Sequence, residues 1–180
     1  MPTRCLRLIT LVLALAAGST ALAGEMEGRA PPPGQPPSPA FDGLKALAGE
    51  WAGTARQGGS DKTFPTKATV KVVSAGSAVM LVTDAGTEHE MVTMFHRDDD
   101  ALLATHYCAA MNQPRMKATP GASATQVAFD FVDGTNLKAF PGRMQGLVMA
   151  MADASHHTQT WTHRDGSTIS TMVFDLARVK

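Results

Sequence analysis

The chain has 180 residues with 16 basic and 16 acidic side chains, so its formal charge at pH 7 is zero. This length accommodates one domain with a sizeable core. A nucleic-acid partner would require a clustered basic surface, which this composition does not indicate, and we predict no nucleic-acid partner.

The first 23 residues have the pattern of a secretory signal peptide. Arg4 and Arg7 precede an apolar run over residues 8–17, and the segment ends in Ala21-Leu22-Ala23. This arrangement is typical of a cleaved export signal, and the apolar run is shorter than the roughly 20 residues of a membrane-spanning helix. We therefore predict a signal peptide over 1–23, a periplasmic or secreted protein, and no integral membrane span after cleavage. The alternative is a retained anchor.

Removal of this peptide leaves 157 of the 180 residues and, because Arg4 and Arg7 are lost, a formal charge of −2. Cys5 lies before the apolar run and is removed as well. The predicted mature chain keeps one cysteine, Cys108, which has no partner for an internal disulfide. In an oxidising compartment Cys108 is then a buried thiol, an intermolecular bridge or a functional sulfur.

A Pro-rich disordered tether is predicted over residues 24–40. Proline, glycine and charged residues dominate this segment, and it lacks the apolar periodicity needed to bury a core. A single domain is predicted over residues 41–180.

The domain is predicted to begin with a short helix over residues 41–47. Phe41, Leu44 and Leu47 recur at the spacing of one helical face, and Gly49 ends the pattern.

Period-two alternation dominates the remainder of the chain. Ala68, Val70 and Val72 alternate with polar residues, which indicates a half-buried strand. Turn signals separate similar runs, and together they predict ten strands, over 50–56, 67–74, 78–84, 88–97, 100–109, 115–119, 125–132, 143–151, 156–164 and 167–178. Closure of such a meander removes exposed strand edges and leaves room for one small ligand. The predicted fold is all-β, a roughly ten-stranded antiparallel up-and-down barrel with a short N-terminal helix.

The segment 44–54, with Gly49-Glu50-Trp51 at its centre, resembles the opening of calycin-type barrels, the group that includes lipocalins, fatty-acid-binding proteins and nitrobindin-like proteins. In that group a short helix leads into a Gly-x-Trp whose tryptophan plugs the closed end. More closely, the chain resembles a bacterial group of uncharacterised exported lipocalin-like proteins. The matching segments are 47–54, 89–94, 105–116 and 158–162. This resemblance implies a fold and no settled activity.

Two positions depart from the pattern of that group. A glycine is usual where this chain has Met111, and a histidine is usual where it has Gln145. If that histidine ligates a metal in other members, Gln145 weakens any shared metal site here.

A hairpin around Asp98-Asp99 brings chemically active side chains together. A two-residue turn there pairs Arg97 with Asp100 and places His89 opposite Cys108. His89, His106 and Cys108 then share one face, on which directly opposed Cβ atoms are roughly 5 Å apart. Both faces of this hairpin carry apolar groups, so the sequence leaves open which one faces the interior.

The last hairpin is predicted to turn at Asp165-Gly166 and to pair Trp161 with Ser170. The face with Trp161 is the predicted interior, so His157, Gln159 and His163 also point inward. A buried polar group without a partner costs about 1–3 kcal/mol. Inward polar groups therefore indicate an internal hydrogen-bond network, a barrel mouth or a ligand pocket.

The predicted function is noncatalytic binding of a small, partly apolar ligand, with no catalytic residue or metal ligand assigned and the cofactor and oligomeric state left open. A pocket of this kind combines an apolar lining with a few polar groups. The candidate ligand-binding residues are His89, His106, Cys108, Arg115, Gln159, Trp161 and His163.

Three other interpretations remain open. Methionine and cysteine sulfur with imidazole suits copper(I), and an inward His163 is a candidate axial haem ligand by analogy with nitrobindin-like barrels. Cys108 with His106 or His89 has the components of thiol catalysis, although a lone cysteine is more often a small buried hydrophobe. Arg115 either braces the turn at 112–115 or binds an anionic ligand at the rim.

Overall fold

The computed structural model describes residues 37–179. The predicted signal peptide and the tether up to residue 36 lie outside the described residues. The first element, α1 (Pro39–Ala46), begins two residues before the predicted helix and within the predicted tether. Proline suits this position because the first helical residues have no intrahelical acceptor for an N–H. Among the described residues, no helix is long and apolar enough to cross a membrane.

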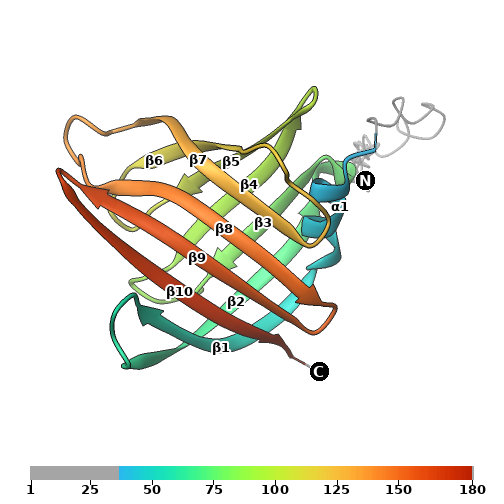
Figure 1. Ribbon diagram of the computed structural model, residues 1–180, viewed down its shortest axis with the longest axis horizontal. Coiled ribbons are helices and arrows are strands. Elements are labelled where there is room, and N and C mark those ends of the chain that lie inside the picture. Colours follow the sequence, from blue (N-terminus) through green and yellow to red (C-terminus); the bar gives the residue numbers. More distant parts are fainter. Residues whose placement is uncertain (1–36, 180) are drawn as a thin grey trace, which may run out of the picture. The chain divides into compact units, whose positions relative to one another are not determined.

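The predicted ten-stranded antiparallel barrel is confirmed (Figure 1). Each strand pairs with the next in the sequence, and the first strand closes the barrel against the last. A three-residue 3₁₀ turn, η1 (Ser74–Gly76), joins the second and third strands. The strands are β1 (Gly49–Gln57), β2 (Thr63–Val73), β3 (Ala78–Thr83), β4 (Met91–Asp98), β5 (Ala101–Tyr107), β6 (Gln113–Ala118), β7 (Gln126–Thr135), β8 (Arg143–Asp153), β9 (His156–Asp165) and β10 (Thr168–Arg178).

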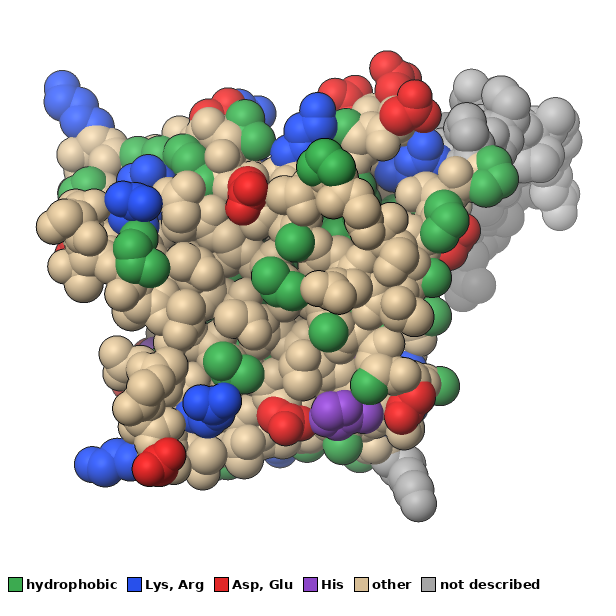
Figure 2. Space-filling model, viewed as in Figure 1, with side chains coloured by type: hydrophobic (Ala, Val, Ile, Leu, Met, Phe, Trp, Pro, Cys, Tyr) green, Lys and Arg blue, Asp and Glu red, His purple; other side chains and the backbone are tan. Residues whose placement is uncertain are grey.

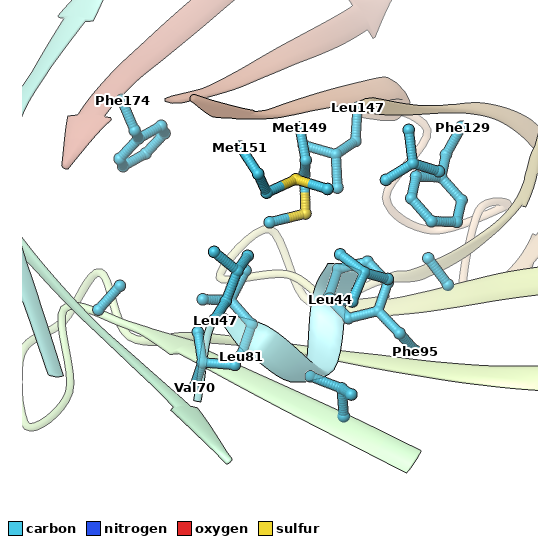
Figure 3. Close-up of a cluster of buried hydrophobic side chains, with 14 of the residues drawn as sticks. Leu44, Leu47, Val70, Leu81, Phe95, Phe129, Leu147, Met149, Met151 and Phe174 are labelled. Atoms are coloured by element: carbon cyan, nitrogen blue, oxygen red, sulfur yellow. The ribbon is translucent and has the colours of Figure 1, made fainter. Parts of the chain in front are cut away.

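Helix α1 fills one end of the barrel. Leu44 and Leu47 of this segment lie among inward side chains of the strands, including Met149, Leu81 and Phe95 (Figure 3). Because the strands alternate in direction, the connections β1–β2, β3–β4, β5–β6, β7–β8 and β9–β10 meet at the opposite end (Figure 1). We call the end that α1 occupies the closed end of the barrel, because helix side chains join the core there. The end where these five connections meet is the open end.

Trp51 and Arg178 fasten α1 to the closed end. The indole Nε1 of Trp51 donates to the Leu47 carbonyl oxygen at 2.8 Å. The guanidinium of Arg178 lies 4.3 Å from the centre of the Trp51 ring, a cation–π contact. Arg178 also donates to three backbone carbonyls, those of Ala46 (3.0 Å), Ala48 (2.7 Å) and Ala154 (2.7 Å). One side chain thus joins the end of the helix, the first strand and the β8–β9 turn.

Both hairpins that were predicted in detail turn one residue later than expected. Asp98 pairs with Ala101 and Asp165 pairs with Thr168, so the turns are Asp99-Asp100 and Gly166-Ser167. Asp99 (φ 51°) and Gly166 (φ 57°) adopt positive φ at the first central position, as in a type II′ turn. The predicted turn at Asp98-Asp99 and the predicted type I′ turn at Asp165-Gly166 are therefore wrong.

The pairing shift of two residues keeps every side chain on its predicted face, because side-chain direction in a strand repeats every two residues. His106 consequently lies opposite Thr93 rather than Met91, and Trp161 lies opposite Met172 rather than Ser170.

Charged side chains of both signs are scattered over the face of the barrel seen in Figure 2. They do not form an extended basic patch on that face, which therefore lacks the electrostatic footprint of a polyanion-binding surface.

Met111 adopts a backbone conformation that suits glycine. Its φ is 65°, and its side chain is 63% exposed in the β5–β6 connection. We expect Met111→Gly to raise the free energy of unfolding by about 0.5–1 kcal/mol, because it relieves left-handed strain and removes little buried area. Chemical denaturation measures the change. Ala110→Gly is the matched control, since Ala110 has no positive φ and should lose stability instead. A loss of stability in Met111→Gly would contradict the strain argument.

Candidate ligand-binding cavity

A cavity of about 430 Å³ lies in the open half of the barrel. At the closed end α1 supplies side chains to the interior, whereas small residues such as Ala55 and Ala109 line the wall of the open half. The volume falls within the range of small-molecule sites, roughly 300–1,000 Å³. Six large apolar side chains contribute to its wall: Phe64, Met91, Met144, Trp161, Met172 and Phe174.

His106, on β5, is a buried polar residue in the wall of this cavity. Its Nδ1 lies 2.9 Å from Oγ1 of Thr93 on the neighbouring strand β4. Its Nε2 is buried and has no hydrogen-bond partner among the described residues. Burial lowers the pKa of His106 to about 4, so the ring is neutral at pH 7. One residue of the cavity wall thus has an unsatisfied imidazole nitrogen.

Trp161, on β9, connects the cavity to the closed end. Its ring lies 4.6 Å from the His106 ring, and its Nε1 donates to Oε1 of Gln159 at 3.0 Å. Gln159 in turn donates from Nε2 to Nε2 of His157 at 3.2 Å, and the His157 ring meets Trp51 edge-on at 4.3 Å. These inward polar groups therefore form an internal hydrogen-bond network below the cavity.

His157 is neutral for the same reason as His106. Burial is the main cause that lowers its pKa to about 4, and the nearby charges of His156 and Arg178 add to the effect. Since its Nε2 accepts from Gln159, its proton is on Nδ1, which is buried without a partner among the described residues.

Asp84 lies at the edge of the cavity, directly after β3. Its Oδ1 accepts hydrogen bonds from Thr66 Oγ1 at 2.8 Å and from the Lys67 backbone N–H at 3.0 Å. Its own backbone N–H donates to the Lys67 carbonyl at 2.9 Å. The carboxylate is thus held in one place at the cavity edge.

The structure brings three of the seven predicted site residues to the cavity and a fourth directly below it. His106 and Trp161 form part of its wall, and His89 lies at its edge in the β3–β4 connection, where its side chain is exposed. Gln159 lies below, bonded to Trp161.

The other three residues lie elsewhere. Cys108 is half-buried in the β5–β6 connection, and burial raises the pKa of its thiol. Arg115 is exposed and makes two hydrogen bonds of 2.5 Å to the carboxylate of Asp133, which lower the pKa of that carboxyl. His163 is half-buried beside Gly142 and does not line the cavity.

The predicted convergence of His89, His106 and Cys108 is therefore not found. Among residues 37–179 no three His, Cys, Asp or Glu side chains are grouped closely enough to hold a metal ion. Of these three residues His106 alone lies in a strand. Because β4 begins at Met91 and β5 ends at Tyr107, His89 and Cys108 belong to loops and do not share a sheet face with it.

No protein-family model and no curated protein matches the chain. The closed ten-stranded antiparallel barrel is compatible with a calycin-type fold.

Sequence reasoning did not single out Thr93 or Asp84 as site residues, and it placed Asn112 in a turn over 112–115. Asn112 is fully buried, and its Nδ2 donates instead to the carbonyls of Phe140 (2.8 Å) and Gly142 (2.6 Å). It therefore ties the β5–β6 connection to the β7–β8 connection at the open end. Alternation placed His106 and Thr93 on the same face of the hairpin and left open whether that face is the interior. A correct turn position would have paired the two residues.

Proposed function

We propose that the barrel noncatalytically binds a small, partly apolar molecule in the cavity at its open end. The observation that carries this proposal is a cavity of about 430 Å³ whose apolar wall contains an unsatisfied His106 nitrogen. Ligand sites combine such an apolar lining with a few polar groups that fix orientation. A ligand atom bonded to this nitrogen would offset the cost of about 1–3 kcal/mol for leaving it unpaired.

The lining also favours binding of more than one molecular shape. Met91, Met144 and Met172 lie in the wall, and methionine side chains adapt to irregular partners through three rotatable bonds. The environment of Cys108 supports binding rather than thiol catalysis. A reactive thiol needs a lowered pKa, and burial raises the pKa of this one.

Copper(I) binding is the second candidate, because the same three methionines share the cavity with His106. Thioether sulfur and neutral imidazole are ligands that suit copper(I). The His106 nitrogen Nε2 and the sulfurs of Met91, Met144 and Met172 are the ligands this candidate would use.

We also infer a relationship to calycin-type barrels. Two features support it: the helix at the closed end and the Gly-x-Trp of β1. Both features lie at the closed end of the barrel, so the open end remains free for a ligand.

Native mass spectrometry of the purified protein, with metal analysis of the same sample, tests both candidates. We expect a noncovalent mass addition that is lost on denaturation and the absence of stoichiometric copper. Ala55→Leu should weaken the binding that gives this addition, because Ala55 lines the cavity and a larger side chain takes up part of its volume. The matched control is Ala52→Leu on the same strand, since Ala52 does not line the cavity and its substitution should leave binding intact.

One equivalent of copper in the purified protein would favour copper(I) binding over binding of a small, partly apolar molecule. A protein that carries no small molecule, and whose melting temperature no apolar compound in a broad screen raises, would overturn the ligand-binding proposal.

A further inference from the structure

We propose that the molecule bound in this cavity is uncharged and presents a hydrogen-bond-accepting oxygen to His106, and that anionic amphiphiles such as fatty acids are excluded. This inference rests on the proposed function and adds the chemical class of the ligand. Three observations carry it: the contact between Thr93 and His106, the residues that line the cavity, and the position of Asp84.

The first observation decides which nitrogen of His106 carries the proton. The Thr93 hydroxyl meets Nδ1 at 2.9 Å and no other hydrogen-bond acceptor among the described residues. If Nδ1 carried the proton, the hydroxyl proton of Thr93 and the lone pair of Nε2 would both be unsatisfied. If the hydroxyl donates to Nδ1, the proton of His106 is on Nε2 and one donor alone lacks a partner. The second arrangement leaves fewer unpaired groups and is therefore favoured.

His106 consequently contributes an N–H donor to the cavity wall. The ring is neutral, since its pKa is about 4, and it lies against Trp161. A neutral donor is satisfied by a carbonyl, ester or ether oxygen. A ligand that has donors alone would leave this N–H unpaired.

The second and third observations exclude an anion. Among the described residues that line the cavity there is no lysine or arginine. The one carboxylate in the wall, Asp84, is fixed at the edge by its bonds to Thr66 and Lys67. A carboxylate ligand would enter past a like charge and lose its hydration with no lysine or arginine to pair with, which is strongly unfavourable.

The test compares methyl decanoate, decanoate and decane, which share one chain and differ in charge and acceptor. Calorimetry or ligand-observed NMR at pH 7 measures their dissociation constants. We expect the ester to bind at least ~10-fold more tightly than decanoate. The double variant His106→Phe/Thr93→Val removes both hydrogen-bonding partners together and keeps an aromatic ring against Trp161. It should weaken ester binding by roughly 3- to 10-fold and leave decane binding unchanged. Tyr107→Phe, on the outer face of β5, is the control and should change the binding of neither the ester nor decane.

The protonation of His106 is checked without any ligand. A long-range ¹H–¹⁵N NMR spectrum of the wild-type protein distinguishes the two neutral tautomers, and we expect the proton on Nε2. A proton on Nδ1 would overturn the inference even if the double variant does not fold. Decanoate binding as tightly as the ester, or an ester that does not bind, would overturn it as well. The proposed function survives these results as long as native mass spectrometry shows a bound molecule.

Discussion

Lowering the pH from 7 to 4 is expected to destabilise the barrel through its two buried histidines, His106 and His157. Both have a pKa of about 4 in the folded protein, against 6.5 for an ordinary histidine. Between these values the unfolded chain binds more protons than the folded one, so the free energy of unfolding falls as the pH falls. The loss begins near pH 6.5 and is complete below pH 4. Its size is about 3 kcal/mol for each histidine.

That loss is large beside the typical stability of a domain, about 5–15 kcal/mol. Urea denaturation at half-unit steps between pH 7 and pH 4 measures it. The double variant His106→Phe/Thr93→Val lacks the contribution of His106, so its free energy of unfolding should depend less steeply on pH. His89→Gln is the control, because it removes a histidine whose side chain is exposed in the β3–β4 connection.

A free energy of unfolding that stays constant between pH 6.5 and pH 4.5 would show that the two rings are already protonated or hydrated in the folded state. The carboxyls of Asp133 and Asp153 have lowered pKa values, so the stability that they contribute is lost as the pH falls below about 5. The change between pH 6.5 and about pH 5 therefore reports the two histidines.

The fold was predictable because its determinants are local. Alternation of polar and apolar residues marks each strand, and Trp51 and Leu47 fall at spacings that the sequence displays directly. Strand count and side-chain faces do not depend on which residue begins a turn. Pairing partners do depend on it, and both detailed hairpins turned at the residue that takes a positive φ, Asp99 and Gly166, rather than one residue earlier.

The cavity was less predictable because it depends on contacts between distant strands. His106 on β5 meets Trp161 on β9, and no local pattern relates these two residues. The inward position of Gln159 and His157 was predictable, since they alternate with Trp161. Their connection into one hydrogen-bond network depends on side-chain conformation, which alternation does not describe. The same holds for Arg115, whose partner Asp133 is set by the bulged pairing of β6 and β7.

The closed end offers the second large effect, and Trp51→Ala is expected to reduce the free energy of unfolding by about 3–5 kcal/mol. Trp51 is fully buried and contacts the helix, β9 and β10 through Leu47, His157 and Arg178. Its removal leaves a cavity and also frees the Arg178 guanidinium from its stacking position. Thermal and urea denaturation measure the change.

The contact with Arg178 is separable from the packing of the ring. Arg178→Ala removes three hydrogen bonds to backbone carbonyls and the stacking on Trp51, so we expect it to cost about 2–3 kcal/mol. In a double-mutant cycle, the stability losses of the single variants Trp51→Ala and Arg178→Ala should sum to more than the loss in the double variant. Each single substitution already removes the same cation–π contact. Ile169→Ala, at an exposed position of β10, should change stability by less than about 0.5 kcal/mol. Strict additivity would mean that Arg178 fastens the helix through its carbonyl contacts alone and that stacking on Trp51 contributes nothing to closing the barrel.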